Sequence, residues 1–283
     1  MSFYGTSFSF DGVSCEEYGL MLYDFDSTTQ SASSWATGTK INEERIAQRF
    51  RSIYYGKTEE APLEFTLVFG ADEYAARGRE PLDRYEMQAI AKWLTGPKDY
   101  RYLQIDQPDM ADIRYRCVIT NLQVLEYAGK KWAFSCKVHC DSPYAYTTPK
   151  TYTMDFAGLA SNMTIYNPSS IADDYKPKIT LTLSEDSGNT IAIYNRSNGT
   201  ALAFDGLPIG VGSLIIDCER CIITSESGIN MYQYVRLKDE HGEDLPWNPF
   251  DFITLAPGTN AIHCLVGSGK ITFECEFPMN VGG

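Results

Sequence analysis

Apolar and polar residues alternate with a period of two along most of the chain, and this pattern predicts a protein built mainly of β-strands. Leu63, Leu67 and Phe69 fall on one face of such a strand, while Glu64 and Thr66 fall on the other. Similar short runs recur to the end of the chain, separated by turn-forming residues. The 19 tyrosines and 14 phenylalanines also favour sheet.

One stretch, Pro81–Leu94, has the three- and four-residue apolar spacing of an amphipathic helix. Pro81 suits the first helical position, and Gly96 with Pro97 ends the element. A single amphipathic helix among strands is expected to pack on a sheet. The predicted inward face consists of Leu82, Tyr85, Ala89, Ile90, Trp93 and Leu94.

The chain of 283 residues is long for one hydrophobic core, so two domains are expected. The helix lies in the first half, and only strand patterns follow Pro149. Residues 141–149 contain two prolines among small polar residues, which is typical of a domain boundary. The sequence therefore predicts an α+β domain over residues 1–148 and an all-β sandwich over residues 149–283.

Two neighbouring segments of the first domain lack a clear period. Residues 24–40 form a Ser/Thr-rich loop with Trp35 in its middle, which contacts either a partner or its own domain. Residues 41–57 predict either a short helix or a bent strand, with a strand favoured over Gln48–Tyr55. We select as candidates for a subunit interface Trp35, Arg45, Arg49 and Arg51.

The formal net charge of −13 argues against a surface that grips nucleic acid, because such binding needs clustered lysines and arginines. No run of 18 apolar residues occurs, so no membrane insertion is expected. The first residues lack the basic region and apolar core of a secretory signal, so we expect synthesis in a cytoplasm.

No motif for catalysis, cofactor binding or metal binding stands out, so a non-enzyme without cofactors is expected. Most of the eight cysteines lie on apolar faces of strands, as buried hydrophobic residues do. The pair Cys218 and Cys221 flanks a predicted hairpin tip rather than opening a helix. A zinc site from Cys136, His139 and Cys140 is disfavoured, since a strand directs the histidine away from both thiols.

The order of elements resembles that of the distal tail proteins of phages with long, non-contractile tails. The resemblance covers almost the whole chain, and it is carried by short segments rather than by one motif. These segments are Phe8–Gly12, Glu17–Leu20, Pro62–Leu67, Trp93–Leu94, Tyr102–Leu103, Phe134–Cys136, Asp141–Tyr144, Ile215–Cys218 and Phe252–Asn260.

This resemblance implies a virion structural protein at the distal end of the tail. The implied N-terminal domain is of split-barrel type and forms a homo-hexameric ring, and the implied C-terminal domain is a galectin-like sandwich. The implied partners are the tail tube protein, the tape measure protein and the tail-tip hub or receptor-binding proteins. Double-stranded DNA would pass through the lumen without specific binding. The second half has no long insertion of the kind that some relatives use as an arm for receptor-binding proteins.

Two other functions stay open at this point. A β-sandwich with exposed aromatic residues could bind cell-wall glycans by stacking on sugar rings, through Tyr232, Tyr234 or Trp247. Two carboxylates that converge in a cleft would instead indicate a wall hydrolase. An acidic lumen that does not retain DNA is a further expectation from the net charge.

Overall fold

The computed structural model describes residues 6–23, 39–59, 61–72, 80–157, 161–184, 190–208, 212–236 and 252–281. It is mainly β, as predicted, with one α-helix in the described residues. The chain divides into two compact units, residues 1–148 with 279–283 and residues 149–278. The last residues, which the sequence pattern assigned to the second domain, thus belong to the first unit. Within the described residues, no helix is long and apolar enough to cross a bilayer.

The first unit is built on one antiparallel sheet of nine strands. The main path has the order β2-β1-β7-β8-β9-β6-β3, and β10 joins it by pairing with both β8 and β20. The strands are β1 (Ser7–Phe10), β2 (Val13–Ser14), β3 (Leu20–Leu22), β6 (Glu64–Ala71), β7 (Arg101–Asp106), β8 (Ile113–Tyr127), β9 (Lys130–Cys140), β10 (Ala145–Thr147) and β20 (Pro278–Met279). Met279 and Val281 pack in the core of this unit, so the chain returns to it after completing the second unit.

The helix α1 (Arg84–Thr95) exists as predicted, but it starts later than Pro81. Asp83 is the N-cap, and its Oδ1 accepts from the backbone N–H groups of Tyr85 and Glu86 at 2.7 and 2.8 Å. The predicted inward face was partly wrong, because the side chain of Tyr85 is 83% exposed. Ile90 and the residue one turn later, Leu94, set the buried face, and Tyr85 lies on the opposite side.

Trp93 fixes the helix to the N-terminal strand of the sheet. Its indole Nε1 donates to the backbone oxygen of Phe10 at 3.0 Å. Its ring stacks on Tyr18 and Phe8, with centroids 4.8 and 5.8 Å away. A short 3₁₀ turn, η1 (Cys15–Tyr18), brings Tyr18 to this position. The aromatic cluster therefore joins segments about 80 residues apart and locks α1 in place.

The alternation of apolar residues shifts by one position between Ile119 and Leu122, which predicts a bulge or bend, and β8 confirms it. The register with β9 shifts between Thr120 and Gln123, and Asn121 has a φ of 51°. A residue with positive φ in a strand marks a bulge, which bends the ladder. Beyond the bend, β8 and β9 continue as a hairpin that ends at Tyr127 and Lys130.

The second unit is a β-sandwich of two sheets that enclose one core. One sheet has the order β11-β19-β13-β16-β17 and the other the order β12-β18-β14-β15. The strands are β11 (Lys150–Ala157), β12 (Ser161–Asn167), β13 (Lys178–Leu183), β14 (Ile191–Asn195), β15 (Ala201–Phe204), β16 (Ser213–Asp217), β17 (Ile222–Ser225), β18 (Gly258–Val266) and β19 (Ser268–Cys275).

The apolar patterns of Met231–Leu237 and Phe250–Leu255 predict two more strands of this unit, and both predictions are wrong. The first range falls on a 3₁₀ turn, η2 (Tyr232–Tyr234), followed by a bridge at Val235, and among the described residues of the second range only Leu255 forms an isolated bridge. Phe252, Ile253 and Leu255 are all buried, so consecutive apolar residues mark burial here rather than a ladder. The strands β12 and β15 were not predicted, because β12 is largely polar and β15 is short.

Candidate assembly surface

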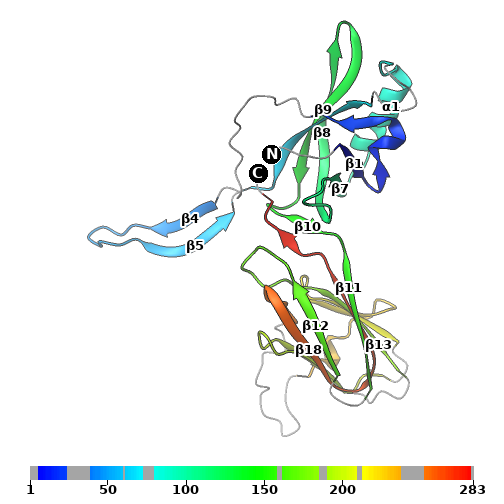
Figure 1. Cartoon of the computed structure of the whole chain (residues 1–283). Helices are drawn as coiled ribbons and strands as arrows, with labels where there is room; N and C mark the ends of the chain where they lie inside the picture. The colour runs from blue at the N-terminus through cyan, green and yellow to red at the C-terminus, as the bar shows by residue number, and fades with distance from the viewer. Residues whose placement is uncertain are drawn as a thin grey trace. The chain divides into compact units, whose positions relative to one another are not determined.

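The strands β4 (Thr39–Glu44) and β5 (Ile53–Glu59) form a two-stranded sheet of their own. They pair with each other and with no other described strand, and Figure 1 shows them as a separate ribbon. A bulge between Asn42 and Glu43 interrupts their register. An isolated hairpin is only marginally stable in water, so this one needs contacts that its own ladder does not supply.

The connection of this hairpin, residues 45–52, carries the three arginines selected from the sequence. Its backbone is tightened by a bond from Arg49 N–H to the oxygen of Ile46 at 3.1 Å, and Gln48 has a φ of 70°. The strand predicted over Gln48–Tyr55 is therefore correct only from Ile53 onward. All three arginines, Arg45, Arg49 and Arg51, are exposed.

These arginines form no ion pair with any described residue. The structure therefore brings three of the four selected residues together on one exposed connection. The fourth, Trp35, lies outside the described residues.

The hairpin exposes large apolar side chains in a proportion that is unusual for a surface. The side chain of Phe50 has an exposure of 107%, the value of a residue that touches nothing. The sequence contains a signal for this exposure, because the consecutive residues Ile53, Tyr54 and Tyr55 of one strand cannot all face one core. The exposed apolar residues of the hairpin are Ile41 (62%), Ile46 (41%), Phe50, Tyr54 (61%) and Tyr55 (63%).

Polar contacts within the hairpin tie its two strands together. Ser52 Oγ donates to Glu43 Oε2 at 2.7 Å, and the Tyr55 hydroxyl donates to Glu44 Oε2 at 3.1 Å. Residues 39–59 contain five basic and three acidic side chains, whereas the whole chain has a net charge of −13. The hairpin is thus a basic, aromatic segment on an acidic protein.

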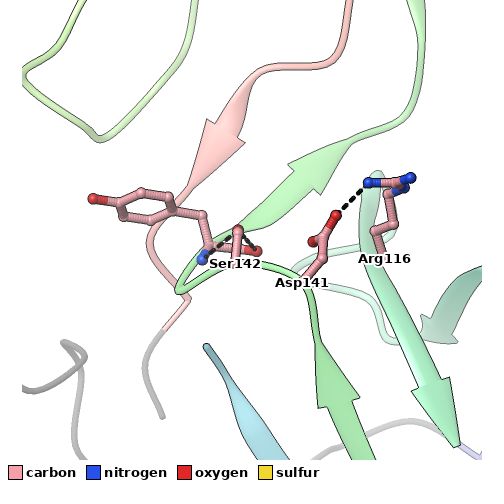
Figure 2. Close-up of polar contacts among 4 residues, drawn as sticks. Arg116, Asp141 and Ser142 are labelled. Atoms are coloured by element: carbon pink, nitrogen blue, oxygen red, sulfur yellow. Dashed lines mark hydrogen bonds and ion pairs between the residues drawn. The ribbon is translucent and has the colours of Figure 1, made fainter. Parts of the chain in front are cut away.

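The segment that leaves the first unit is fixed by a second polar cluster, shown in Figure 2. Arg116 on β8 forms an ion pair with Asp141, and the backbone N–H of Asp141 donates to the backbone oxygen of Arg116 at 3.0 Å. Ser142 Oγ accepts from the N–H of Tyr144 and donates to its backbone oxygen, both at 3.0 Å. The segment Asp141–Tyr144 that carried part of the family resemblance is therefore a structural corner.

Arginine side chains lie against tyrosine rings beside this corner. The Arg114 guanidinium lies 3.9 Å from the centre of the Tyr102 ring, and that of Arg116 lies 5.7 Å from Tyr100. Burial lowers the pKa of Arg116, but the hydrogen bond and charge of Asp141 outweigh it, so the pKa is raised. Arg116 therefore stays charged and keeps the corner in place.

The cysteines and the histidine considered for catalysis or metal binding either pack in the core or form local polar contacts. Cys136 and Cys140 are buried, and burial raises the pKa of both thiols to about 12. His139 lies on the other side of β9, where its Nδ1 is 2.6 Å from Glu64 Oε1. Cys218 is buried and Cys221 is exposed at the turn between β16 and β17, as the predicted hairpin tip requires. The described residues hold no cluster of potential metal ligands.

The aromatic residues considered for glycan binding are also accounted for in part. Tyr232 and Tyr234 are half-buried and pack against the core of the second unit. Their rings are therefore engaged in packing rather than displayed as a stacking platform. Trp247 lies outside the described residues.

Comparison with known proteins connects both units to phage tails. A family model described as a phage tail protein N-terminal domain matches residues 3–142, and a second, a phage tail C-terminal domain, matches residues 144–275. No curated protein sequence is significantly similar to the chain.

Among solved structures, the chain is similar to the Dit (gp 19.1) protein of phage SPP1, titled a paradigm of the hub adsorption apparatus in phages that infect Gram-positive bacteria. The TM-score is 0.62 at 13% sequence identity, over 96% of this chain and 98% of that one. The two family models confirm a phage tail protein, and the shared fold agrees with the resemblance found in the sequence. The two matched domains together span nearly the whole chain. The chain therefore belongs to the family of phage tail proteins that these two domains define.

Proposed function

We propose that this tail protein is a distal tail adaptor whose first unit assembles into a homo-hexameric ring. The ring would join the tail tube protein and tape measure protein on one side to the tail-tip hub or receptor-binding proteins on the other. The β4–β5 hairpin is the observation that supports assembly most directly. It displays five large apolar side chains that remain exposed in the single chain.

The chemistry of the hairpin favours a second copy of the chain as its partner. A ring requires two different complementary surfaces on each subunit, which contact each other around the symmetry axis. The hairpin is basic and aromatic, and the rest of the chain is acidic. Arg45, Arg49 and Arg51 would meet acidic groups of the neighbouring subunit, while Phe50 and Tyr54 would be buried there. Trp35, in the preceding loop, would add to the same contact.

The mass of the full chain in solution tests the ring. We expect a species of six chains by light scattering, reached at high protein concentration if assembly is weak. Replacing Phe50→Ser together with Tyr54→Ser should shift the protein to single chains. The matched control is Tyr85→Ser, which removes an exposed tyrosine from α1 of the same unit and should leave the ring intact.

The basic residues are tested separately from the apolar ones. Trp35→Ala combined with Arg49→Glu should also dissociate the ring, whereas Arg84→Glu, an equal charge reversal on the exposed start of α1, should not. A ring that survives both hairpin variants would refute the assigned interface. A wild-type chain that stays single at every concentration would refute the ring itself.

Passage of the genome is the second part of the proposal. We infer an acidic lumen from the net charge of −13, since like charge prevents DNA from adhering to the wall. The assembled protein should therefore fail to retard double-stranded DNA in a gel even at low ionic strength. Retardation that disappears with added salt would contradict this part, because it would reveal a basic bore.

A further inference from the structure

The edge strands of the second unit are protected to very different degrees. Unpaired sheet edges invite pairing with other chains, and proteins usually block them. The edge strand β17 has a bridge between Thr224 and Asn230, and β15 has one between Phe204 and Val235. The edge strand β12 pairs with β18 on one side and with no described strand on the other.

The sequence of β12 has none of the usual features that block an edge. Its seven residues, Ser161–Asn167, include no charged residue and no proline, and the ladder with β18 runs without a bulge. By contrast, the neighbouring edge strand β11 contains Lys150 and Asp155. An uncharged edge of this length is able to accept another strand.

The hydrogen bonds of β18 show which backbone groups of β12 face outward. Ala261 on β18 donates its N–H to Ser197 Oγ at 3.1 Å and accepts from Arg196 N–H at 2.9 Å, so both of its groups point away from β12. Its partner in the register is Thr164. In such a pair, both residues direct their N–H and C=O away from each other. By alternation, the outward groups belong to Asn162, Thr164 and Tyr166.

A contact with β11 agrees with this direction. The carbonyl oxygen of Tyr166 accepts a hydrogen bond from the hydroxyl of Tyr152 on β11 at 3.3 Å. This carbonyl is therefore accessible from the side of β12 that faces away from β18. The outward N–H and C=O of Thr164, at the centre of the strand, bond to no described residue. The middle of the edge is therefore left unpaired by the part of the chain that the structure describes.

We propose that β12 pairs antiparallel with β12 of a second copy, about a two-fold axis that passes beside Thr164. This register places the two Thr164 residues opposite each other as a hydrogen-bonded pair. It also places Asn162 of each copy opposite Tyr166 of the other, so every outward backbone group finds a partner. Residues on the core side, Met163 and Ile165, meet each other in the same register, which extends the apolar face of the sheet.

The charge of the chain favours a second copy as the occupant of this edge. Two copies of a protein with a net charge of −13 repel each other, so contacts between them are expected where charge is lowest. The edge β12 is such a place, and Tyr166, 60% exposed, would be partly covered there. The contact is isologous and lies in the second unit, so it does not depend on the proposed ring.

Cross-linking of the full chain tests this register. Thr164→Cys, made in a Cys221→Ser background to remove the one exposed thiol, should form a disulfide-linked dimer under mild oxidation. Opposed residues of a hydrogen-bonded pair have Cα atoms about 5.5 Å apart, within the range for a disulfide. We expect most of the protein to run at twice the chain mass on a non-reducing gel.

Two further variants make the result decisive. Thr259→Cys places an exposed thiol on the same face but one strand further in, and it should not cross-link. Adding Asn162→Pro to Thr164→Cys removes one outward N–H and should abolish cross-linking at an unchanged melting temperature. The proposal would be overturned if Thr164→Cys formed no dimer, or if Thr259→Cys formed as much dimer as Thr164→Cys. Without a Thr164→Cys dimer, a strand of another protein would be the remaining partner for this edge.

Discussion

The two long hairpins of the first unit have the same local construction and opposite surroundings. The β8–β9 hairpin pairs with β7 on one side and β6 on the other, and its inward residues Phe134, Cys136 and Val138 are buried. The β4–β5 hairpin pairs with nothing else among the described strands, and its apolar residues are exposed.

The difference shows that a strand pattern does not by itself determine where an apolar side chain is buried. In β8–β9 the alternation matches one core, and the chain itself supplies that core. In β4–β5 the apolar residues occupy both faces and the connection, which no single sheet can bury. We therefore regard β8–β9 as part of the core of the first unit and β4–β5 as the segment proposed to contact a neighbouring subunit.

Alkaline pH should destabilise β8–β9 more than any other change considered. Burial raises the pKa of Cys136 and Cys140 to about 12, and burial also raises the pKa of Cys117. In the unfolded chain these thiols ionise near pH 8.5. Their stabilising effect is therefore complete below that pH and is lost progressively up to about pH 12.

The size of this effect follows from linkage. Each thiol should cost about 1.4 kcal/mol of folding free energy per pH unit above its unfolded pKa. Denaturant unfolding at pH 8 and pH 10 measures this loss together with that from the other buried thiols, among them Cys264 and Cys275, and the β4–β5 hairpin, which has no cysteine, should contribute nothing. Equal stability at the two pH values would contradict burial of the three thiols.

The next largest effect is expected from Phe134→Ala in β9. Phe134 is 1% exposed and its ring stacks on Phe69 at 5.5 Å, so its removal leaves a cavity. The free energy of unfolding should fall by about 3–5 kcal/mol. Chemical denaturation followed by tryptophan fluorescence measures the loss, because Trp93 reports on the same core.

Phe50→Ala is the corresponding aromatic-to-alanine substitution in the β4–β5 hairpin. In the dissociated chain it should change the free energy of unfolding by less than about 0.5 kcal/mol, because the side chain contacts nothing. At concentrations where the ring forms, the same change should weaken assembly. A large loss of stability in the dissociated chain would instead show that the hairpin packs on its own unit.

The smallest effect is expected from Tyr55→Phe, which removes the hydroxyl that bonds to Glu44. An exposed hydrogen bond of this kind contributes roughly 0.5 kcal/mol. Amide hydrogen exchange should be faster across β4–β5 in the variant and unchanged across β8–β9. Slower amide exchange across β4–β5 when the ring forms would further distinguish this hairpin from β8–β9.

Much of the fold follows from residue patterns, and most of the proposed interface does not. Alternation predicted the core strands, and the bend in β8 was visible as a shift of that alternation after Ile119. The helix was found from its period, but its phase was wrong because Tyr85 is apolar enough to count and is nevertheless exposed. Periodicity cannot separate an apolar residue that packs in the core from one that stays exposed.

The residues proposed for assembly illustrate the same limit. Arg45, Arg49 and Arg51 were selected because they interrupt apolar residues, and the structure places them on one connection. Phe50 and Tyr54 were overlooked, since they resembled core residues of a strand. The open edge β12 was also overlooked, because polar strands such as Ser161–Asn167 carry a weak alternation signal.

The return of the chain to its first unit has a consequence for synthesis on the ribosome. Met279 and Val281 complete a core that otherwise consists of residues made before position 149. Translation is vectorial, so the first unit has to wait, incomplete, until the whole second unit has been made. Any product that stops early therefore lacks part of that core. A chain that ends before β20 would therefore offer an incomplete first unit to the proposed assembly.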